Sequence, residues 1–303
     1  LIVNINPSAP QPGPIAGPQT VCQGSAVVSY SIDPLNFVSN YEWTIPPGAT
    51  LISGAGTNKI GCLYGTGATS GIVTVKGWNS DCGYGPPKEI SVIVNPLPGP
   101  AGNINSAAGN KICTPSVGVI FESAAIPNAT SYLWNYTGNN VVISNNSTQA
   151  SINFPSNATT GILTVTGANA CGFGPVSPLI SLEVNPRPIV SIPSEINEIL
   201  TVKNGRPIIL RGATPTGTGG VFSGTGVSQN PGGLFIFNPG DNAVTGGGAS
   251  NSVPYTITYR YTNVFNCIDE KTLVVKVFGS NANVPCPGTV TDVRDNTSYE
   301  TFL

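Results

Sequence analysis

Short runs in which apolar and polar residues alternate recur along the chain, and two of them are nearly alike. Residues 161–175 read GILTVTGANACGFGP, and residues 71–86 read GIVTVKGWNSDCGYGP. An alternation of period two predicts a β-strand with one buried face, and the Gly-aromatic-Gly-Pro ending predicts where that strand stops. A cysteine, Cys82 or Cys171, ends each run. Cys171 falls on the buried side of its strand, whereas Cys82 is one residue out of phase, and a β-bulge near residues 80–81 would bring it to the same side.

A second cysteine and a tryptophan precede each run. The order cysteine, tryptophan, cysteine occurs at Cys22, Trp43 and Cys82 and again at Cys113, Trp134 and Cys171. Across about seven short strands, this order is typical of an immunoglobulin-like β-sandwich. A spacing of about 60 residues between the cysteines predicts one disulfide inside each repeat, Cys22 with Cys82 and Cys113 with Cys171, with the tryptophans packed on the bridges.

The ends of the repeats are marked by Asn-Pro. Strand-like runs that end in Asn-Pro recur with a period of about 90 residues, which predicts a tandem array. We expect residues 1–6 to be the last strand of a preceding repeat, 7–96 and 97–186 to be two repeats, and 187–279 to be a divergent third. The junctions at residues 95–98 and 185–188 read Asn-Pro-x-Pro, and such linkers are semi-rigid. The prediction is therefore an all-β chain of sandwiches in an extended rod.

The third repeat lacks the tryptophan and the cysteine pair. In the run that begins at Tyr255, the side chains of Tyr255, Ile257, Tyr259 and Tyr261 share one face. Residues 272–277 predict the last strand. We expect this sandwich to be held mainly by aromatic packing.

The composition agrees with an all-β chain and limits its partners. Of 303 residues, 37 are glycine and 28 proline, and only 9% are charged, which favours many turns over long helices. The net charge of −2 gives no basic surface for nucleic acid, and no apolar run is long enough to cross a membrane. Cysteine used in disulfides predicts an oxidising, extracellular setting.

Candidate chemistry is sparse. The chain contains no histidine, which excludes Ser-His-Asp and Cys-His catalysis and histidine-ligated metals. Asp269 and Glu270 are adjacent, but neighbours on a strand point to opposite faces. The glycine-rich run at residues 216–220 is not followed by a helix pattern, so we read it as a turn rather than a phosphate site. We expect no catalytic, metal or cofactor site.

Three cysteines lie outside the predicted pairs. Cys62 is out of phase with its neighbours and has no counterpart in the second repeat, so we expect a free thiol. Cys267 and Cys286 could bond to each other, although a partner for Cys286 beyond residue 303 is the preferred expectation, and an intermolecular bridge at any of the three is a further alternative.

One residue is a candidate ligand contact. Trp78 shares the polar face of its strand with Thr74 and Lys76, and an exposed tryptophan can stack on a sugar or a partner protein. The plainer reading, which we favour, is packing under a neighbouring loop or linker.

Several short segments carry a family resemblance. They are Val21-Cys22, Tyr41-Glu-Trp43, Pro47-Gly-Ala-Thr50 and Gly71-Ile-Val-Thr-Val75 with Asn79 and Cys82-Gly83. Through them the first two repeats resemble the PKD-like, immunoglobulin-like repeats of large secreted surface proteins of Bacteroidota. The third repeat resembles another repeat of such proteins through residues 222–227 and 255–259. Residues 280–303 are expected to be a linker and the start of a truncated domain, similar to the start of the Fibrobacter major paralogous domain.

This resemblance implies export by the type IX system and display on the cell surface, as in gliding-motility adhesins. We expect a non-enzymatic stalk segment of an adhesin or filament, whose partners are neighbouring repeats of the same chain and surface polysaccharides or proteins. The alternatives are a carbohydrate- or protein-binding module and the accessory domains of a secreted enzyme.

Overall fold

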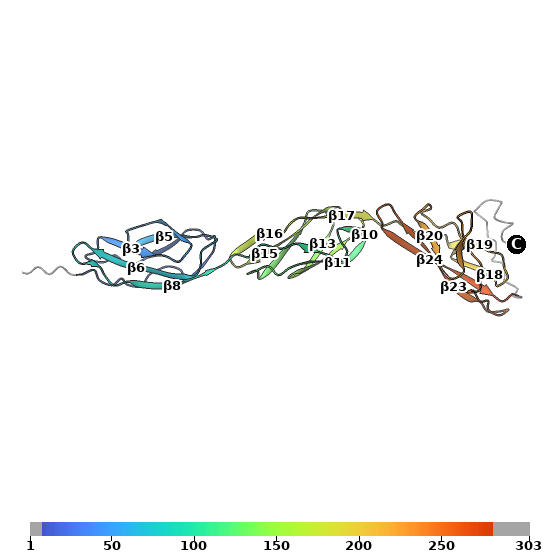
Figure 1. The fold of residues 1–303 in the computed structure, drawn as a ribbon, viewed down its shortest axis with the longest axis horizontal. Helices are drawn as coiled ribbons and strands as arrows, with labels where there is room; N and C mark the ends of the chain where they lie inside the picture. The colour runs from blue at the N-terminus through green and yellow to red at the C-terminus, as the bar shows by residue number, and fades with distance from the viewer. Residues whose placement is uncertain (1–7, 281–303) are drawn as a thin grey trace, which may run out of the picture. The chain divides into compact units, whose positions relative to one another are not determined.

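The computed structural model describes residues 8–280, and within this range the chain is built from β-strands with one short 3-10 helix, η1 (Ser194–Ile196) (Figure 1). The strands of this range form six sheets, two in each of three successive stretches of sequence, named here the first, second and third repeats. The all-β prediction is confirmed. The strand predicted at residues 1–6 and the tail that contains Cys286 lie outside the described residues.

The described chain divides into two compact units. One contains the residues up to 110 together with 118–153 and 161–182, and the other contains 111–117, 154–160 and the residues from 183 onward. The division therefore runs through the second repeat, and each unit is described by itself.

In the first repeat, a five-stranded sheet faces a three-stranded one. The larger sheet has the order β1-β8-β6-β3, with β7 paired to β6. Its strands are β1 (Thr20–Cys22), β8 (Lys88–Asn95), β6 (Gly71–Asn79), β3 (Asn40–Thr44) and β7 (Gly83–Tyr84). The smaller sheet has the order β2-β5-β4, formed by β2 (Val28–Ser31), β5 (Lys59–Tyr64) and β4 (Ala49–Ser53).

The second repeat has the same five-stranded arrangement, in the order β10-β17-β15-β12 with β16 paired to β15. These strands are β10 (Lys111–Thr114), β17 (Ile180–Pro186), β15 (Gly161–Asn169), β12 (Ser131–Tyr136) and β16 (Gly172–Val176). The second sheet, β13-β14-β11-β9, comprises β13 (Val142–Asn146), β14 (Gln149–Phe154), β11 (Ser116–Ser123) and β9 (Ile104–Asn105).

The third repeat has a four-stranded and a three-stranded sheet. The first, β18-β24-β23-β20, comprises β18 (Glu198–Val202), β24 (Ile268–Phe278), β23 (Val253–Thr262) and β20 (Gly220–Ser223). The second, β19-β22-β21, comprises β19 (Ile208–Ile209), β22 (Phe235–Phe237) and β21 (Val227–Gln229).

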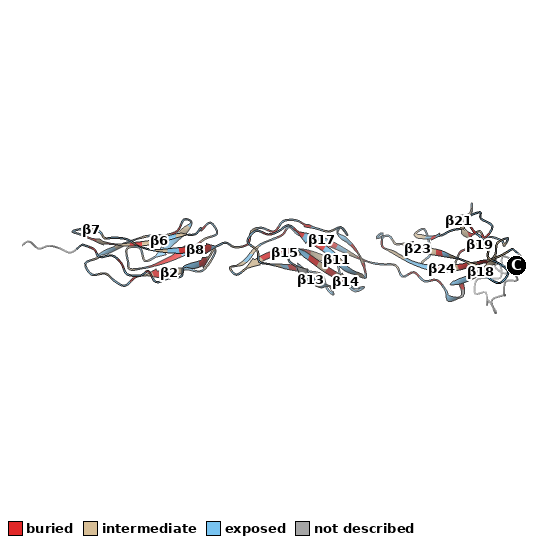
Figure 2. Ribbon diagram, turned by 90° about the horizontal axis from the view of Figure 1, so that it is seen from below, coloured by how far each residue is buried: buried red, intermediate tan, exposed pale blue. Residues whose placement is uncertain are grey.

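The buried positions follow the alternation seen in the sequence. In β6, Val73 and Val75 are fully buried while Thr74 and Lys76 lie on the other face. Buried stretches, coloured red, lie along strands of each repeat (Figure 2). In β23, Ile257 and Tyr259 are buried as predicted, and the ring centroids of Phe222 and Tyr259 lie 4.5 Å apart. Such aromatic pairs add to the burial of apolar area, but most residues of the buried cluster are aliphatic, so the prediction that this repeat is held mainly by aromatic packing is wrong.

One strand near the start of each repeat, β1, β10 or β18, pairs in parallel with the last strand of that repeat. A parallel pair needs a long crossover between its two strands, and here the rest of the sandwich supplies it. This early strand therefore runs toward the same end of the repeat as the last strand, which is the end where the chain leaves the repeat. In the first two repeats, this end carries the cysteines considered next.

Candidate functional site: the disulfide-linked junctions

The first cysteine of a repeat lies beside the asparagine that ends the same repeat. In the parallel register, Cys22 is opposite Asn95 and Cys113 is opposite Asn185. Proline follows each asparagine, and because proline has no N–H to donate, the ladder ends close to this point. The pairing thus places a thiol sulfur where the chain crosses into the next repeat.

The later cysteine lies in a turn beyond the end of its strand. β15 ends at Asn169, and the Oδ1 of this residue accepts a hydrogen bond from the Cys171 N–H at 2.8 Å. In the third repeat, the Oδ1 of Asn263 accepts from the Cys267 N–H at 2.9 Å. An asparagine side chain that folds back on the following backbone stabilises such a turn. Each cysteine is therefore presented at the end of its sandwich, outside the core face.

Two disulfides join these positions, and each joins one repeat to the next. Cys22 is bonded to Cys171, with a Cα–Cα distance of 5.4 Å, and Cys113 is bonded to Cys267, with a Cα–Cα distance of 5.5 Å. Both distances are ordinary for disulfides. The first bridge lies wholly within one compact unit and the second wholly within the other.

The predicted pairs are therefore wrong. Cys22 does not bond to Cys82, and Cys113 does not bond to Cys171, although three of the four cysteines named for disulfides are bridged. The physical reason is the turn. Extending the strand period past Asn169, or past Asn79 with a one-residue bulge, puts the next cysteine on the core face, whereas the chain leaves the strand at the asparagine. Cys82 lies in the same kind of turn, and its N–H donates to the Oδ1 of Asn79 at 3.1 Å.

The same asparagines also hold the linker. Nδ2 of Asn169 donates to the carbonyl of Pro96 at 2.9 Å, and Nδ2 of Asn263 donates to the carbonyl of Pro186 at 2.8 Å. Both prolines belong to the Asn-Pro junctions. The amide oxygen of each asparagine thus positions the bridged cysteine, and the amide nitrogen binds the linker. The hydrogen bonds and the disulfide therefore stabilise the same arrangement of linker and turn.

Glycine permits a close approach of the linker. A Cβ at Gly174 would lie 2.5 Å from the carbonyl oxygen of Pro98, and one at Gly85 would lie closer still to that of Ala9. Both glycines belong to the Gly-aromatic-Gly-Pro segments, which the sequence pattern marks only as strand endings. The structure shows a further role for the second glycine of each segment, because no side chain fits between it and the adjoining backbone.

Cys62 is the cysteine in the core of the first repeat. It is fully buried and carries a free thiol, as expected. Burial raises the pKa of the Cys62 thiol from 9.0 to about 11. The hydroxyl groups of Tyr30 and Tyr64 lie 3.0 Å apart in the same core cluster. The predicted packing of Trp43 against a core disulfide is thus wrong, because the cysteine in this core is the free thiol of Cys62. The Nε1–H of Trp43 instead donates a hydrogen bond to the carbonyl of Thr57 at 2.8 Å.

Trp78 lies on the outer face of its sheet, as predicted, and is half-buried. Its cross-strand neighbour is Tyr84. The Nζ of Lys76 lies 4.1 Å from the centroid of the Tyr84 ring and 3.1 Å from Oε1 of Glu42. Hydrogen bonding from Tyr84, and then from Lys76, lowers the pKa of Glu42. The face therefore offers aromatic surface beside a paired cation and anion.

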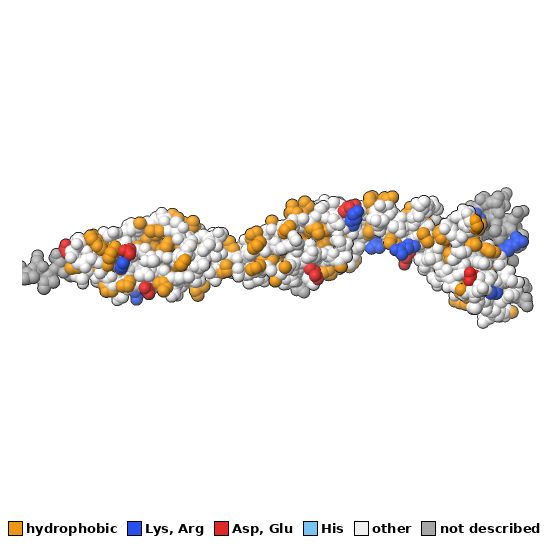
Figure 3. All heavy atoms as spheres, in the orientation of Figure 1, with side chains coloured by type: hydrophobic (Ala, Val, Ile, Leu, Met, Phe, Trp, Pro, Cys, Tyr) orange, Lys and Arg blue, Asp and Glu red, His pale blue; other side chains and the backbone are white. Residues whose placement is uncertain are grey.

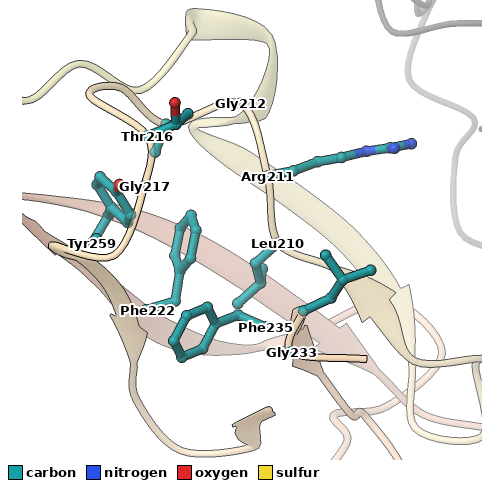
Figure 4. Close-up of a pocket in the computed structure, with 12 residues that line it drawn as sticks. Leu210, Arg211, Gly212, Thr216, Gly217, Phe222, Gly233, Phe235 and Tyr259 are labelled. Atoms are coloured by element: carbon teal, nitrogen blue, oxygen red, sulfur yellow. The ribbon is translucent and has the colours of Figure 1, made fainter. Parts of the chain in front are cut away.

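A cavity of about 270 Å³ lies in the third repeat (Figure 4). The rings of Phe222, Phe235 and Tyr259 line it, while the side chain of Arg211 points away from them (Figure 4). Thr216 and Gly217 belong to its rim, so the glycine-rich run forms part of a loop beside apolar side chains, which agrees with its reading as a turn. Nothing in the sequence pattern indicated this cavity.

Polar chemistry is sparse elsewhere in the described chain. No group of three or more histidine, cysteine or carboxylate side chains gathers in residues 8–280 in a way that could hold a metal ion. Asp269 acts as a structural acceptor, since its Oδ2 receives the Val190 N–H at 2.8 Å. The visible face carries few charges among uncharged and apolar side chains (Figure 3). Within the same range, no helix is long and apolar enough to cross a membrane.

Comparison with known families identifies the repeats. The model of the PKD-like domain family matches residues 8–92 and again residues 97–181. The chain belongs to the PKD-like domain family. The two matches cover more than half of its length, and the sheets of these stretches show the sandwich architecture that the resemblance implied.

Several solved structures of tandem-domain proteins match the chain at low identity. A three-domain segment of titin, I67–I69, is 12% identical with a TM-score of 0.40, over 90% of this chain and 99% of that one. Domains 3–5 of Drosophila OTK are 12% identical with a TM-score of 0.31, over 86% and 93%. The human desmocollin-1 ectodomain is 10% identical with a TM-score of 0.32, over 86% and 59%. No curated protein matches the chain.

Proposed function

We propose that this PKD-like chain is a non-enzymatic stalk segment of a large cell-surface adhesin or filament, with a role in adhesion or gliding motility. The observation that carries the proposal is the pair of disulfides that join successive repeats. A bridge inside one sandwich stabilises that sandwich, whereas a bridge between sandwiches keeps their connection intact under load. A stalk needs the second property.

The family and the chemistry of the chain support this reading. Tandem PKD-like domains with disulfides are typical of extracellular proteins. The chain has no histidine, and the cavity of its third repeat has an apolar lining with the arginine pointing outward, which favours a structural role over catalysis. The resemblance to Bacteroidota surface proteins supports type IX export and display at the cell surface.

A second candidate is a binding module for a polysaccharide or a surface protein. The half-buried Trp78 beside Tyr84, with the Lys76–Glu42 pair, is the surface that favours it. Aromatic side chains next to hydrogen-bonding groups suit a sugar ring. The accessory domain of a secreted enzyme is a third reading, on the same observations as the stalk.

A binding screen separates the first two candidates. The oxidised chain is tested against surface polysaccharides and intact cells, with Trp78→Ala in parallel and Phe173→Ala, in the corresponding strand pair of the second repeat, as the matched control. The stalk proposal predicts no saturable binding by any of the three proteins. Saturable binding that Trp78→Ala abolishes and Phe173→Ala leaves intact would replace the stalk with a recognition module.

A further inference from the structure

The two disulfides overlap along the chain. Their cysteines occur in the order Cys22, Cys113, Cys171, Cys267, and the bonds join the first to the third and the second to the fourth. The loop of chain closed by each bridge therefore contains one cysteine of the other bridge. Two bridges inside separate repeats, as the spacing of the cysteines predicted, would have no such overlap.

The overlap creates three covalent connections in parallel. One bridge makes Cys22 and Cys171 a single node, and the other makes Cys113 and Cys267 a second node. Three stretches of chain connect these nodes. They are residues 22–113, 113–171 and 171–267, and their lengths are 91, 58 and 96 positions. The distance between the nodes cannot exceed the length of the shortest connection, which is the run inside the second repeat.

We propose that the overlapping bridges act as an extension limiter. Tension that enters before Cys22 crosses directly to Cys171, passes through the second repeat to Cys113, and leaves through Cys267. The body of the first repeat, residues 23–95, and most of the third belong to the two longer connections. Because all three connections span the same two nodes, neither longer connection can be extended beyond the length of the run from 113 to 171 while both bridges are intact.

The lengths make the limiter quantitative. At roughly 3.4 Å per extended residue, the connection between positions 113 and 171 spans about 200 Å. The unbridged chain from Cys22 to Cys267 would span about 830 Å on the same basis. The inference concerns the covalent topology alone, so it holds whether or not the proposed stalk function is correct. A failed binding screen and a failed extension experiment are therefore separate results.

The experiment is single-molecule extension of the full chain, held at its two ends and stretched to its contour limit. With both bridges intact, the shortest covalent path contains about 115 residues, and the expected limit is about 390 Å. After reduction, the expected limit is about 2.6-fold longer. The pair of substitutions Cys22→Ser and Cys171→Ser, or the pair Cys113→Ser and Cys267→Ser, leaves one bridge and is expected to lengthen the limit about 1.3-fold.

The control is Cys82→Ser, which alters neither bridge and is expected to keep the limit of the unmodified chain. Two results would overturn the proposal. A limit of about 630 Å in the oxidised chain corresponds to bridges confined within each repeat, and a limit that does not change on reduction corresponds to no bridge under tension. Because the readout is a contour length, partial loss of folding in a variant does not obscure it.

Discussion

Cys22 and Cys171 are bonded to each other although their positions differ by 149, and they belong to different repeats. Cys113 and Cys267 repeat the relationship at the next junction, with a separation of 154. In both cases the first cysteine lies beside the last asparagine of its own repeat, and the second follows an asparagine that binds the linker. The junction, rather than the core, is thus where this chain uses its disulfides.

Loss of a bridge is expected to destabilise the oxidised chain. In the chain-entropy model, a bridge that closes about 150 residues contributes on the order of 5 kcal/mol, and overlap of the two loops makes their contributions non-additive. We expect the double variant Cys113→Ser/Cys267→Ser to melt at a lower temperature by calorimetry, while Cys82→Ser melts with the wild type. Equal melting temperatures for all three proteins would show that the bridge adds no stability.

Asn169 is expected to control formation of the first bridge. Asn169→Ala removes the acceptor for the Cys171 N–H and the donor to Pro96. This change costs about 1–3 kcal/mol because the partners lose their hydrogen bonds. The readout is the fraction of refolded chain that contains the Cys22–Cys171 bridge, measured by mass spectrometry.

The matched variant at this position is Asn169→Asp, which keeps an oxygen acceptor but has no N–H to donate. We expect it to form more of the bridge than Asn169→Ala and less than the wild type. If both variants form the bridge as fully as the wild type, the asparagine is not needed to present the cysteine.

Gly174 is expected to be intolerant of a side chain. A Cβ there would lie 2.5 Å from the Pro98 carbonyl oxygen, a distance at which the linker must move. We expect Gly174→Ala to lower the yield of the Cys22–Cys171 bridge on refolding. Gly67→Ala is the control, because a Cβ at that position has no atom within 4 Å. Equal yields from the two variants would contradict the close-packed linker.

Stability at alkaline pH should depend on Cys62. Burial holds the pKa of this thiol at about 11 in the fold against 9.0 in the unfolded chain, so the unfolded state releases its proton first. Stability from this group is complete below pH 9 and is lost as the pH rises toward 11, by about 3 kcal/mol. Denaturant titrations at pH 8 and pH 10 should show a smaller decline for Cys62→Ala than for the wild type. A decline of equal size in both proteins would assign it to other groups.

The alternation of apolar residues predicted the fold well, because a strand with one buried face leaves a clear pattern. Val73 and Val75 in the first repeat and Ile257 and Tyr259 in the third are buried where this pattern places them. The pattern describes only what happens inside a strand. It therefore failed at Cys82 and Cys171, which lie in turns after the strand has ended.

A different signal for the junctions was present in the sequence. Each repeat has an asparagine followed within four positions by a cysteine, at Asn79 and Cys82, at Asn169 and Cys171, and at Asn263 and Cys267. The third repeat has no cysteine before Cys267, so Cys267 cannot bond to an earlier cysteine of its own repeat. The apolar cavity of the third repeat had no comparable signal, since it depends on loops that pack at a distance in the sequence.

The most direct test of the account is peptide mapping of the oxidised, unreduced chain by mass spectrometry. The account predicts two cross-linked species, one joining the peptide of Cys22 to that of Cys171 and one joining the peptide of Cys113 to that of Cys267, and reduction should abolish both. Recovery of Cys22 with Cys82 and Cys113 with Cys171 would place the disulfides inside the repeats and would remove both the linked junctions and the extension limiter.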